Sequence, residues 1–406
     1  MKLAFSSLFA LAAAGIAAAA PTAPVRASTP SNELDSVSNA NCTRQTYTVT
    51  SSNAMRTQFN VEAMGNPAGN QTQTTQLFLE FITDQSGFMS RYVTGTQAQT
   101  QDFNISGVFC EPTGQRNENA AVQLLLHGIG FDGSYWNFQG QNVSEEQYSY
   151  VYNAAARGIS TFRYDRIGTG SSEAPSDVFN VAQAATEVGI LEAVAEKLKN
   201  STEIGGRAWN RTLLVGHSYG SAQSQALSVA RPELVDGIIL QGFSANATGL
   251  PFYLAATVYT EASQVFPRAL ARLPPGWLVT ATPASNQLPF VWAPTADASA
   301  VALARNTEQA VTQGSLFSIG SIGGPSNFTG PVAVVLGDKD FIFALNDIQG
   351  PNGTNKAQAA ASMLYAQSSN ATGIVLPDVG HAVNIHRGAQ QAYTQMLDFA
   401  AVNGLA

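Results

Sequence analysis

Apolar runs and amphipathic segments alternate regularly from residue 121 onward. Unbroken apolar runs predict buried strands at 122–126, 159–164, 212–215, 237–240, 331–336 and 374–377. Apolar residues at helical spacing predict helices between them, at 148–156, 182–198, 219–229, 355–367 and 388–402. Strands that alternate with helices form a parallel sheet with helices on both faces. We therefore predict an α/β fold with a mostly parallel, doubly wound sheet.

Two stretches depart from this rhythm. Residues 46–110 carry short apolar segments among Gly, Asn, Gln and Thr, and we expect strands at 46–50, 59–63 and 103–109. Residues 245–330 are rich in aromatic residues and proline, which predicts an insertion that forms a cap over the ligand face. The predicted core is then 46–244 together with 331–406, preceded by a flexible polar leader at 21–45.

The first twenty residues have the pattern of a targeting segment. Lys2 is followed by an Ala- and Leu-rich stretch, 3–20, which ends in small residues before Pro21. This predicts a secretory signal peptide at 1–20. An uncleaved anchor is the alternative, but alanine is weakly apolar and no basic cluster follows. No later stretch is apolar enough to cross a bilayer, so no membrane span is expected after signal removal.

Further features agree with export, and we expect a secreted, extracellular glycoprotein. The chain has ten N-x-Ser/Thr sequons, where composition alone would give about four. They begin at Asn41, Asn70, Asn104, Asn142, Asn200, Asn210, Asn246, Asn327, Asn352 and Asn370. The two cysteines, Cys42 and Cys110, can form one disulfide in an oxidising compartment, with two free buried thiols as the alternative.

Composition excludes several classes of protein. Of the 406 residues, 45% are hydrophobic, which suffices for a large core and argues against a disordered chain. The net charge is −8, from 20 Lys and Arg against 28 Asp and Glu. Nucleic-acid binding needs clustered cations, so we expect no nucleic-acid partner. The cysteine spacing does not fit a metal site, and we predict neither a metal nor a cofactor.

The strongest local motif is Gly216-His217-Ser218-Tyr219-Gly220. A predicted strand runs directly into it and a predicted helix leaves from it. A G-x-S-x-G motif in this context is typical of a nucleophile elbow, in which a strained turn exposes the serine above the sheet. A serine in an ordinary strand–helix turn is the alternative. We identify Ser218 as the candidate nucleophile.

A serine nucleophile needs a base and an orienting acid. The chain has four histidines, of which His381 follows the last predicted strand and can reach back over the sheet. His386 lies nearby and is expected to be structural. Asp340 follows the strand at 331–336 and is the candidate acid, with Asp338 as the alternative. The order Ser218, Asp340, His381 is that of the α/β-hydrolase fold.

A glycine-rich loop, His127-Gly128-Ile129-Gly130, follows the first buried strand of the core. The α/β-hydrolase fold places an oxyanion donor there. We expect the backbone N–H groups of Ile129 and Tyr219 to form the oxyanion hole.

The same loop continues as G-x-G-x-x-G over residues 128–133, which is the dinucleotide-binding pattern. The residues after it, 134–138, are bulky, and the next strand does not end in the ribose-binding acid. We therefore reject a nucleotide site.

With these motifs, residues 104–402 resemble the α/β-hydrolase superfamily, in the branch with a single helical cap. The chain also resembles secreted ascomycete members that have the motifs GHSxGSxQ, here at 216–223, and DGIxLxGFS, here at 236–244. This resemblance implies a fungal source. The resemblance implies a structural role for the Asp165-Arg166 turn. The region 46–110 is longer than in a minimal member, and the loop at Gly128 is not of the Gly-Gly-Gly type, which leaves the acyl-chain preference open.

We predict a secreted serine hydrolase that cleaves a carboxylic ester or lactone of small-molecule size through an acyl-enzyme intermediate. The aromatic residues of the cap favour an apolar substrate. The same triad could instead serve an acyltransferase, a peptidase or an enzyme of secondary metabolism. A non-catalytic binding member of the fold is a further alternative. Dehalogenases and epoxide hydrolases are disfavoured, because they place Asp where Ser218 stands. The oligomeric state is not predicted.

Overall fold

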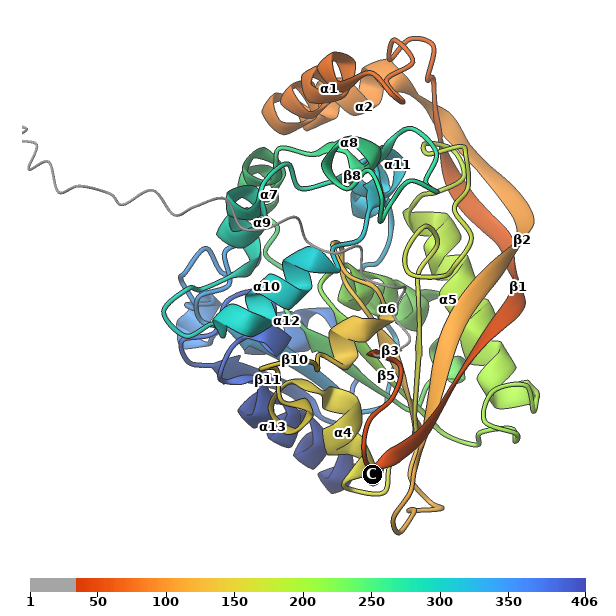
Figure 1. The fold of residues 1–406 in the computed structure, drawn as a ribbon, viewed down its shortest axis with the longest axis vertical. Helices are drawn as coiled ribbons and strands as arrows, with labels where there is room; N and C mark the ends of the chain where they lie inside the picture. The colour runs from red at the N-terminus through yellow and green to blue at the C-terminus, as the bar shows by residue number, and fades with distance from the viewer. Residues whose placement is uncertain (1–33) are drawn as a thin grey trace, which may run out of the picture.

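An eight-stranded sheet runs through the computed structural model, which describes residues 34–406 (Figure 1). The strand order is β1-β2-β4-β3-β5-β6-β10-β11. The strands are β1 (Ala40–Phe59), β2 (Val93–Pro112), β3 (Val122–Leu126), β4 (Thr161–Tyr164), β5 (Thr212–His217), β6 (Gly237–Gln241), β10 (Val332–Gly337) and β11 (Ala371–Leu376). The six strands from β4 to β11 run parallel, whereas β1 and β2 are antiparallel additions at one edge.

The central strands are buried on both faces. Every residue of β3, β5, β6 and β10 is buried, which is why these segments read as continuous apolar runs rather than as an alternating pattern. The predicted parallel α/β sheet is therefore confirmed, with each predicted core strand present within a few residues of its expected bounds.

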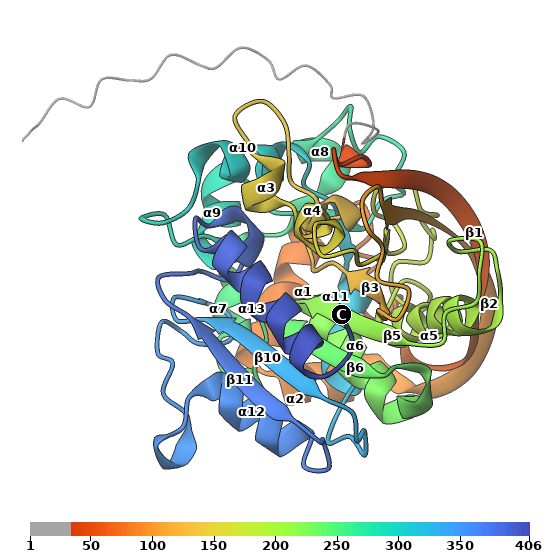
Figure 2. The same ribbon diagram turned by 90° about the horizontal axis from the view of Figure 1, so that it is seen from below.

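Helices cover both faces of the sheet. On one side α4 (Tyr150–Ala155) packs with α13 (Ala389–Val402), and on the other α5 (Ala184–Asn200) packs with α6 (Tyr219–Ala230). Figure 2 shows α13 and α12 (Lys356–Leu364) on opposite sides of β10 and β11. The helix expected at 148–156 is divided into α3 (Glu145–Tyr148) and α4, because Ser149 caps the second segment through Tyr152 N.

The strands β1 and β2 form a long two-stranded ribbon along the outside of the molecule (Figure 1). Cys42 lies opposite Cys110 in the register and the two form a disulfide, as predicted. The boundary predicted at residue 46 is wrong, because β1 begins at Ala40 and Leu34 is already buried. The predicted signal peptide 1–20 and leader residues 21–33 lie outside the described residues. The strand expected at 59–63 is also wrong, since the chain turns after Phe59.

Two helices at the tip of this ribbon were not predicted from the sequence. They are α1 (Gln71–Thr83) and α2 (Gln85–Tyr92), and Figure 1 shows them at one end of the molecule. Asn70 caps α1, and Asp84 both ends α1 and caps α2. Their apolar side chains meet the insertion rather than the sheet, with Phe78 stacked on Tyr259.

The insertion predicted at 245–330 carries five helices and a separate antiparallel sheet of order β7-β8-β9. The helices are α7 (Leu250–Thr257), α8 (Ala262–Val265), α9 (Pro283–Phe290), α10 (Ala298–Asn306) and α11 (Gln313–Ser318). The strands are β7 (Thr260–Glu261), β8 (Trp277–Val279) and β9 (Val311–Thr312). Among residues 34–406, none of the helices combines the length and apolarity needed to cross a membrane.

Candidate active site

Ser218 occupies a tight turn between β5 and α6. The strand ends at His217, the helix begins at Tyr219, and Ser218 adopts φ 53° and ψ −117°. A positive φ is strained for a residue with a side chain, and such strain is characteristic of functional turns. Gly220 is required here, because a Cβ at that position would lie 2.3 Å from the carbonyl oxygen of Leu126. The local geometry is that of the predicted elbow.

A continuous chain of hydrogen bonds runs from this serine to a buried carboxylate. Ser218 Oγ lies 2.8 Å from His381 Nε2, and His381 Nδ1 lies 2.7 Å from Asp340 Oδ2. The other oxygen, Asp340 Oδ1, accepts the N–H groups of Ile342 and Phe343, each at 2.8 Å. A carboxylate can only accept, so Nδ1 carries the proton and Nε2 is free to accept from the serine hydroxyl.

The three side chains lie in apolar surroundings. His381 and Asp340 are fully buried, and Ser218 keeps 9% of its surface exposed. The rings of Phe290 from α9 and Phe343 from the acid loop lie 5.9 and 5.7 Å from the His381 ring. Hydrogen bonds between polar groups are stronger where water is excluded, so this cover reinforces the chain from serine to carboxylate. Neither phenylalanine was singled out from the sequence, because an aromatic residue in an insertion or in a loop carries no local signal of its contacts.

The two predicted oxyanion donors lie on either side of the serine. Tyr219 is the first residue of α6, where a backbone N–H has no partner within the helix. Ile129 follows β3, in a loop that touches the elbow: a Cβ on Gly128 would lie 2.9 Å from Ser218 Cβ. Both residues are almost fully buried, so their amides are shielded from bulk water. The arrangement is compatible with the predicted hole.

The alternative acid and base have other partners. Asp338 Oδ1 accepts the backbone N–H of Asp378 at 2.7 Å, and its Oδ2 lies 3.1 Å from Lys339 Nζ. His386 Nε2 accepts the backbone N–H groups of Trp292 and Gly380, at 3.0 and 3.2 Å. Burial lowers the pKa of His386 to about 4, so it is a neutral acceptor that joins the insertion to the histidine loop.

The other two histidines are buried beside the site. His217 stacks on Tyr135 with ring centroids 4.2 Å apart, and burial holds its pKa well below the usual value. His127 Nε2 accepts the backbone N–H of Arg166 at 3.1 Å, and burial also lowers its pKa. His217 is therefore a neutral packing ring, and His127 is a neutral ring that also makes hydrogen bonds.

The G-x-G-x-x-G segment does not present a free anion site. A four-residue 3-10 helix, η2 (Gly133–Trp136), follows the glycines in place of a long helix. Its first amides already donate to carboxylates: Gly133 N–H to Asp165 at 3.0 Å and Ser134 N–H to Asp132 at 2.9 Å. Two buried carboxylates would repel a pyrophosphate, which agrees with the rejection of a nucleotide site. Within residues 34–406 there is also no cluster of His, Cys, Asp and Glu side chains suited to a metal ion.

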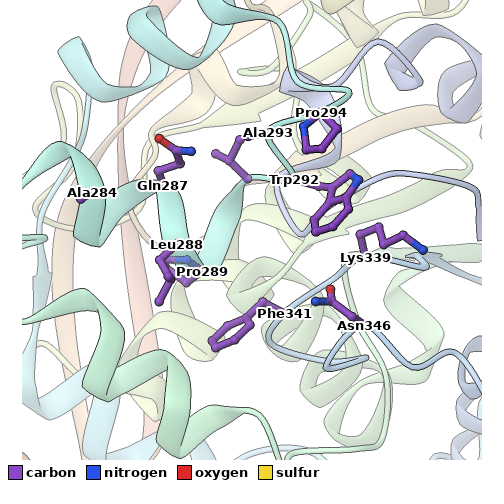
Figure 3. Close-up of a pocket in the computed structure, with 11 residues that line it drawn as sticks. Ala284, Gln287, Leu288, Pro289, Trp292, Ala293, Pro294, Lys339, Phe341 and Asn346 are labelled. Carbon is purple, nitrogen blue, oxygen red and sulfur yellow. The ribbon is translucent and has the colours of Figure 1, made fainter. Parts of the chain in front are cut away.

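A cavity of about 510 Å³ lies between α9 and the acid loop (Figure 3). Leu288 and Pro289 flank it on one side and Trp292, Lys339 and Phe341 on the other. The triad side chains do not line it, but Lys339 and Phe341 are the neighbours of Asp340 in the chain. Phe290, between two residues of the cavity wall, contacts His381 instead. Phe290 therefore connects the wall of the cavity with the His381 ring.

Comparison with known proteins finds a matching family model and similar solved structures. The model of the alpha/beta hydrolase family matches residues 123–392, which is most of the chain. A thermophilic esterase from Thermogutta terrifontis is similar in structure, with 16% identity, coverage of 73% of this chain and 94% of that one, and a TM-score of 0.46. An enol-lactonase from Burkholderia xenovorans has 18% identity, coverage of 74% and 97%, and a TM-score of 0.45. No curated protein matches the sequence.

Proposed function

Because the chain belongs to the alpha/beta hydrolase family, we propose that it is a serine hydrolase that cleaves carboxylic esters or lactones. The single observation that carries the proposal is the unbroken chain from Ser218 Oγ through His381 to Asp340, with bonds of 2.8 and 2.7 Å. A serine hydroxyl is a weak nucleophile by itself, and an adjacent base that is oriented by a carboxylate activates it.

The proposed reaction begins with attack of Ser218 Oγ on the substrate carbonyl carbon, while the hydroxyl proton passes to His381 Nε2. Asp340 stabilises the imidazolium that forms. As the carbonyl oxygen gains negative charge, it accepts hydrogen bonds from the backbone N–H groups of Ile129 and Tyr219. Loss of one such donor typically costs about 3 kcal/mol in the barrier.

The tetrahedral intermediate then collapses. The bond to the leaving oxygen breaks, His381 gives its proton to that oxygen, and an alcohol departs from an acyl-enzyme on Ser218. Water attacks the acyl carbon after giving a proton to His381 Nε2. The second intermediate releases the carboxylic acid as the proton returns to Ser218 Oγ, which restores the starting state. For a lactone, acid and alcohol leave as one hydroxy acid.

The surroundings favour an apolar substrate. The triad lies under Phe290 and Phe343, and the neighbouring cavity is lined mainly by Leu, Pro, Val, Trp and Phe side chains. Apolar groups gain most from burial in such a site. We propose that residues 245–330 act as the cap that supplies this surface, and that the substrate is a small uncharged ester or lactone.

The proposal extends to where the protein works. The Cys42–Cys110 disulfide is typical of exported proteins, and all ten sequon asparagines keep accessible surface. We propose that the chain is secreted and carries N-glycans. Treatment of the secreted protein with an N-glycosidase should raise its mobility on a gel, and an unchanged mobility would reject glycosylation.

The decisive experiment labels the protein with a fluorophosphonate, wild type beside Ser218→Ala, and then tests a panel of p-nitrophenyl esters and lactones. We expect labelling and turnover by the wild type, and loss of both in a variant with an unchanged melting temperature. Turnover only with an added alcohol acceptor would favour an acyltransferase. A folded wild type that neither reacts with the label nor turns over any substrate would reject the proposal.

A further inference from the structure

A buried ion pair contacts Tyr219 and the Gly128 carbonyl, whose peptide group carries the Ile129 N–H. Arg166 Nη1 and Glu187 Oε2 lie 2.6 Å apart, and each side chain is only 3% exposed. Arg166 follows β4 and Glu187 lies in the first turn of α5, so neither belongs to the triad loops. The resemblance to the family implied only a structural role for the Asp165-Arg166 turn, yet its contacts converge on the catalytic loops.

The guanidinium binds the peptide group that carries the first donor. Arg166 Nη2 donates to the carbonyl oxygen of Gly128 at 3.2 Å. That carbonyl shares its peptide plane with the N–H of Ile129. The chain has no cis peptide bond among its described residues, so this N–H points away from the oxygen that Arg166 holds. The arginine thus fixes the direction of the Ile129 donor.

The same carbonyl receives a second hydrogen bond, from His127 Nδ1 at 2.9 Å. His127 Nε2 accepts the backbone N–H of Arg166, so Nδ1 carries the ring proton and donates. A carbonyl that accepts from a cation and from an imidazole is strongly polarised. Polarisation of a peptide strengthens its N–H as a donor, and the effect is larger in buried surroundings.

The ion pair also holds the second donor residue. The guanidinium lies over the Tyr219 ring, 4.8 Å from its centroid, and the Tyr219 hydroxyl donates to Glu187 Oε1 at 3.1 Å. Glu187 accepts further bonds from Gln223 Nε2 at 3.1 Å and from Ser315 Oγ at 2.9 Å. The start of α6 and the insertion are therefore tied to one carboxylate.

We propose that Arg166, anchored by Glu187, is a positioning residue that orients and polarises the Gly128–Ile129 peptide and fixes Tyr219 for stabilisation of the oxyanion. The proposal rests on the proposed serine-hydrolase function. In this proposal the charged pair does not contact the substrate. It contributes to stabilisation of the transition state rather than to substrate binding. A purely structural role would instead lower the melting temperature without a selective effect on kcat.

The test compares Arg166→Met, Arg166→Lys and Glu187→Gln with the wild type on one p-nitrophenyl ester. We expect Arg166→Met to lower kcat by roughly tenfold to a hundredfold, less than the loss of a whole donor, with KM little changed. Arg166→Lys keeps the positive charge and an N–H donor group, without the planar fork of the guanidinium, and should recover part of the loss. The inhibition constant of a trifluoromethyl ketone, whose adduct places an oxyanion in the hole, should rise in parallel with the loss in kcat/KM.

The matched control is Arg305→Met, which breaks the ion pair with Glu308 inside the insertion; the side-chain hydrogen bonds of both residues go to residues 280–308 and not to the triad. We expect it to lower the melting temperature and leave kcat and the inhibition constant nearly unchanged. A folded Arg166→Met with kcat within about twofold of wild type, or with a loss confined to KM, would overturn the inference while the hydrolase stands. If Arg166→Met does not fold, Glu187→Gln and Arg166→Lys decide by the same criteria. An inactive, unlabelled wild type would overturn both proposals.

Discussion

The residues of the triad and the residues that cover them are held in different ways. Ser218, Asp340 and His381 follow the ends of β5, β10 and β11, three strands joined through β6 by backbone hydrogen bonds. Phe290, one of the two rings over His381, comes from residues 245–330, where β7 and β9 have only two residues each. The structure of this insertion depends on side-chain contacts between residues far apart in the sequence. It has no extended set of backbone hydrogen bonds between long strands.

The contacts between the insertion and α1 illustrate this second mode. Glu261 is 3% exposed and accepts the backbone N–H groups of Gly69 at 2.8 Å and Gly276 at 2.9 Å. Gln71 donates to the carbonyl oxygen of Tyr259 at 2.9 Å. The segment at the tip of the β1–β2 ribbon thus stabilises the insertion through these hydrogen bonds. Backbone hydrogen bonds between strands therefore hold the candidate triad, whereas side-chain contacts between distant segments hold the insertion.

The largest expected effect tests the sheet-held region. Replacing Asp340 with Asn removes the charge that orients His381 and stabilises its imidazolium, and we expect kcat to fall by about 10⁴-fold. Asp338→Asn, in the same loop, is the matched control and should leave kcat nearly unchanged. Steady-state kinetics on a p-nitrophenyl ester measures both. Equal losses in the two variants would mean that the acid is assigned to the wrong residue.

The next effect tests the cover. Phe290→Ala removes a buried ring from above His381, and we expect a loss of about 4 kcal/mol in the free energy of unfolding. It also removes the ring that connects the wall of the cavity in Figure 3 with His381, so we expect bulky esters to gain in kcat/KM relative to acetate. Phe252→Ala, at a ring that is 57% exposed on α7, is the control. An unchanged substrate preference in Phe290→Ala would show that the cavity does not serve the substrate.

A smaller effect tests whether the hydrogen bonds of Glu261 stabilise the insertion. Glu261→Met leaves the amides of Gly69 and Gly276 without an acceptor, at a cost of about 3 kcal/mol. Hydrogen exchange should then accelerate in residues 60–92 and 259–281, while β5 and β10 stay protected. Glu62→Gln, at an exposed position of the same excursion, should change neither. Equal acceleration in β5 would mean that sheet and cover unfold as one unit.

The smallest effect concerns His386, which connects the insertion with the loop that carries His381. Its folded pKa is about 4, below the usual 6.5, because burial disfavours the charged ring. The unfolded chain therefore binds the extra proton, so the stability from this residue is complete above pH 6.5 and is lost as the pH falls towards 4. The destabilisation caused by His386→Gln should shrink by about 2 kcal/mol between pH 7.5 and pH 4.5. Urea unfolding at both pH values measures it, and a constant difference would contradict the assignment.

Much of the core could be read from the sequence, since buried parallel strands appear as apolar runs and the elbow has a local signature. The candidate triad followed, because strand order and chain order restrict which Asp and His can meet a serine at the end of β5. Disulfide formation was expected from the only two cysteines. The start of β1 at Ala40 was missed, because a half-exposed edge strand with a polar sequence resembles a leader.

Other features depend on the tertiary structure alone. The helix α1 was not predicted, because its first six residues are polar and its buried apolar positions, Leu77, Phe78 and Phe81, span barely one turn. Its Asn70 cap and its packing on Tyr259 stabilise it. The Arg166–Glu187 pair joins residues 21 positions apart, whose meeting no local pattern records. Local patterns determine strands, turns and the order of chemical groups, because these depend on neighbours in the chain. Which ring covers the histidine and which charge holds the oxyanion peptide depend on packing between distant segments, and only the folded molecule decides them.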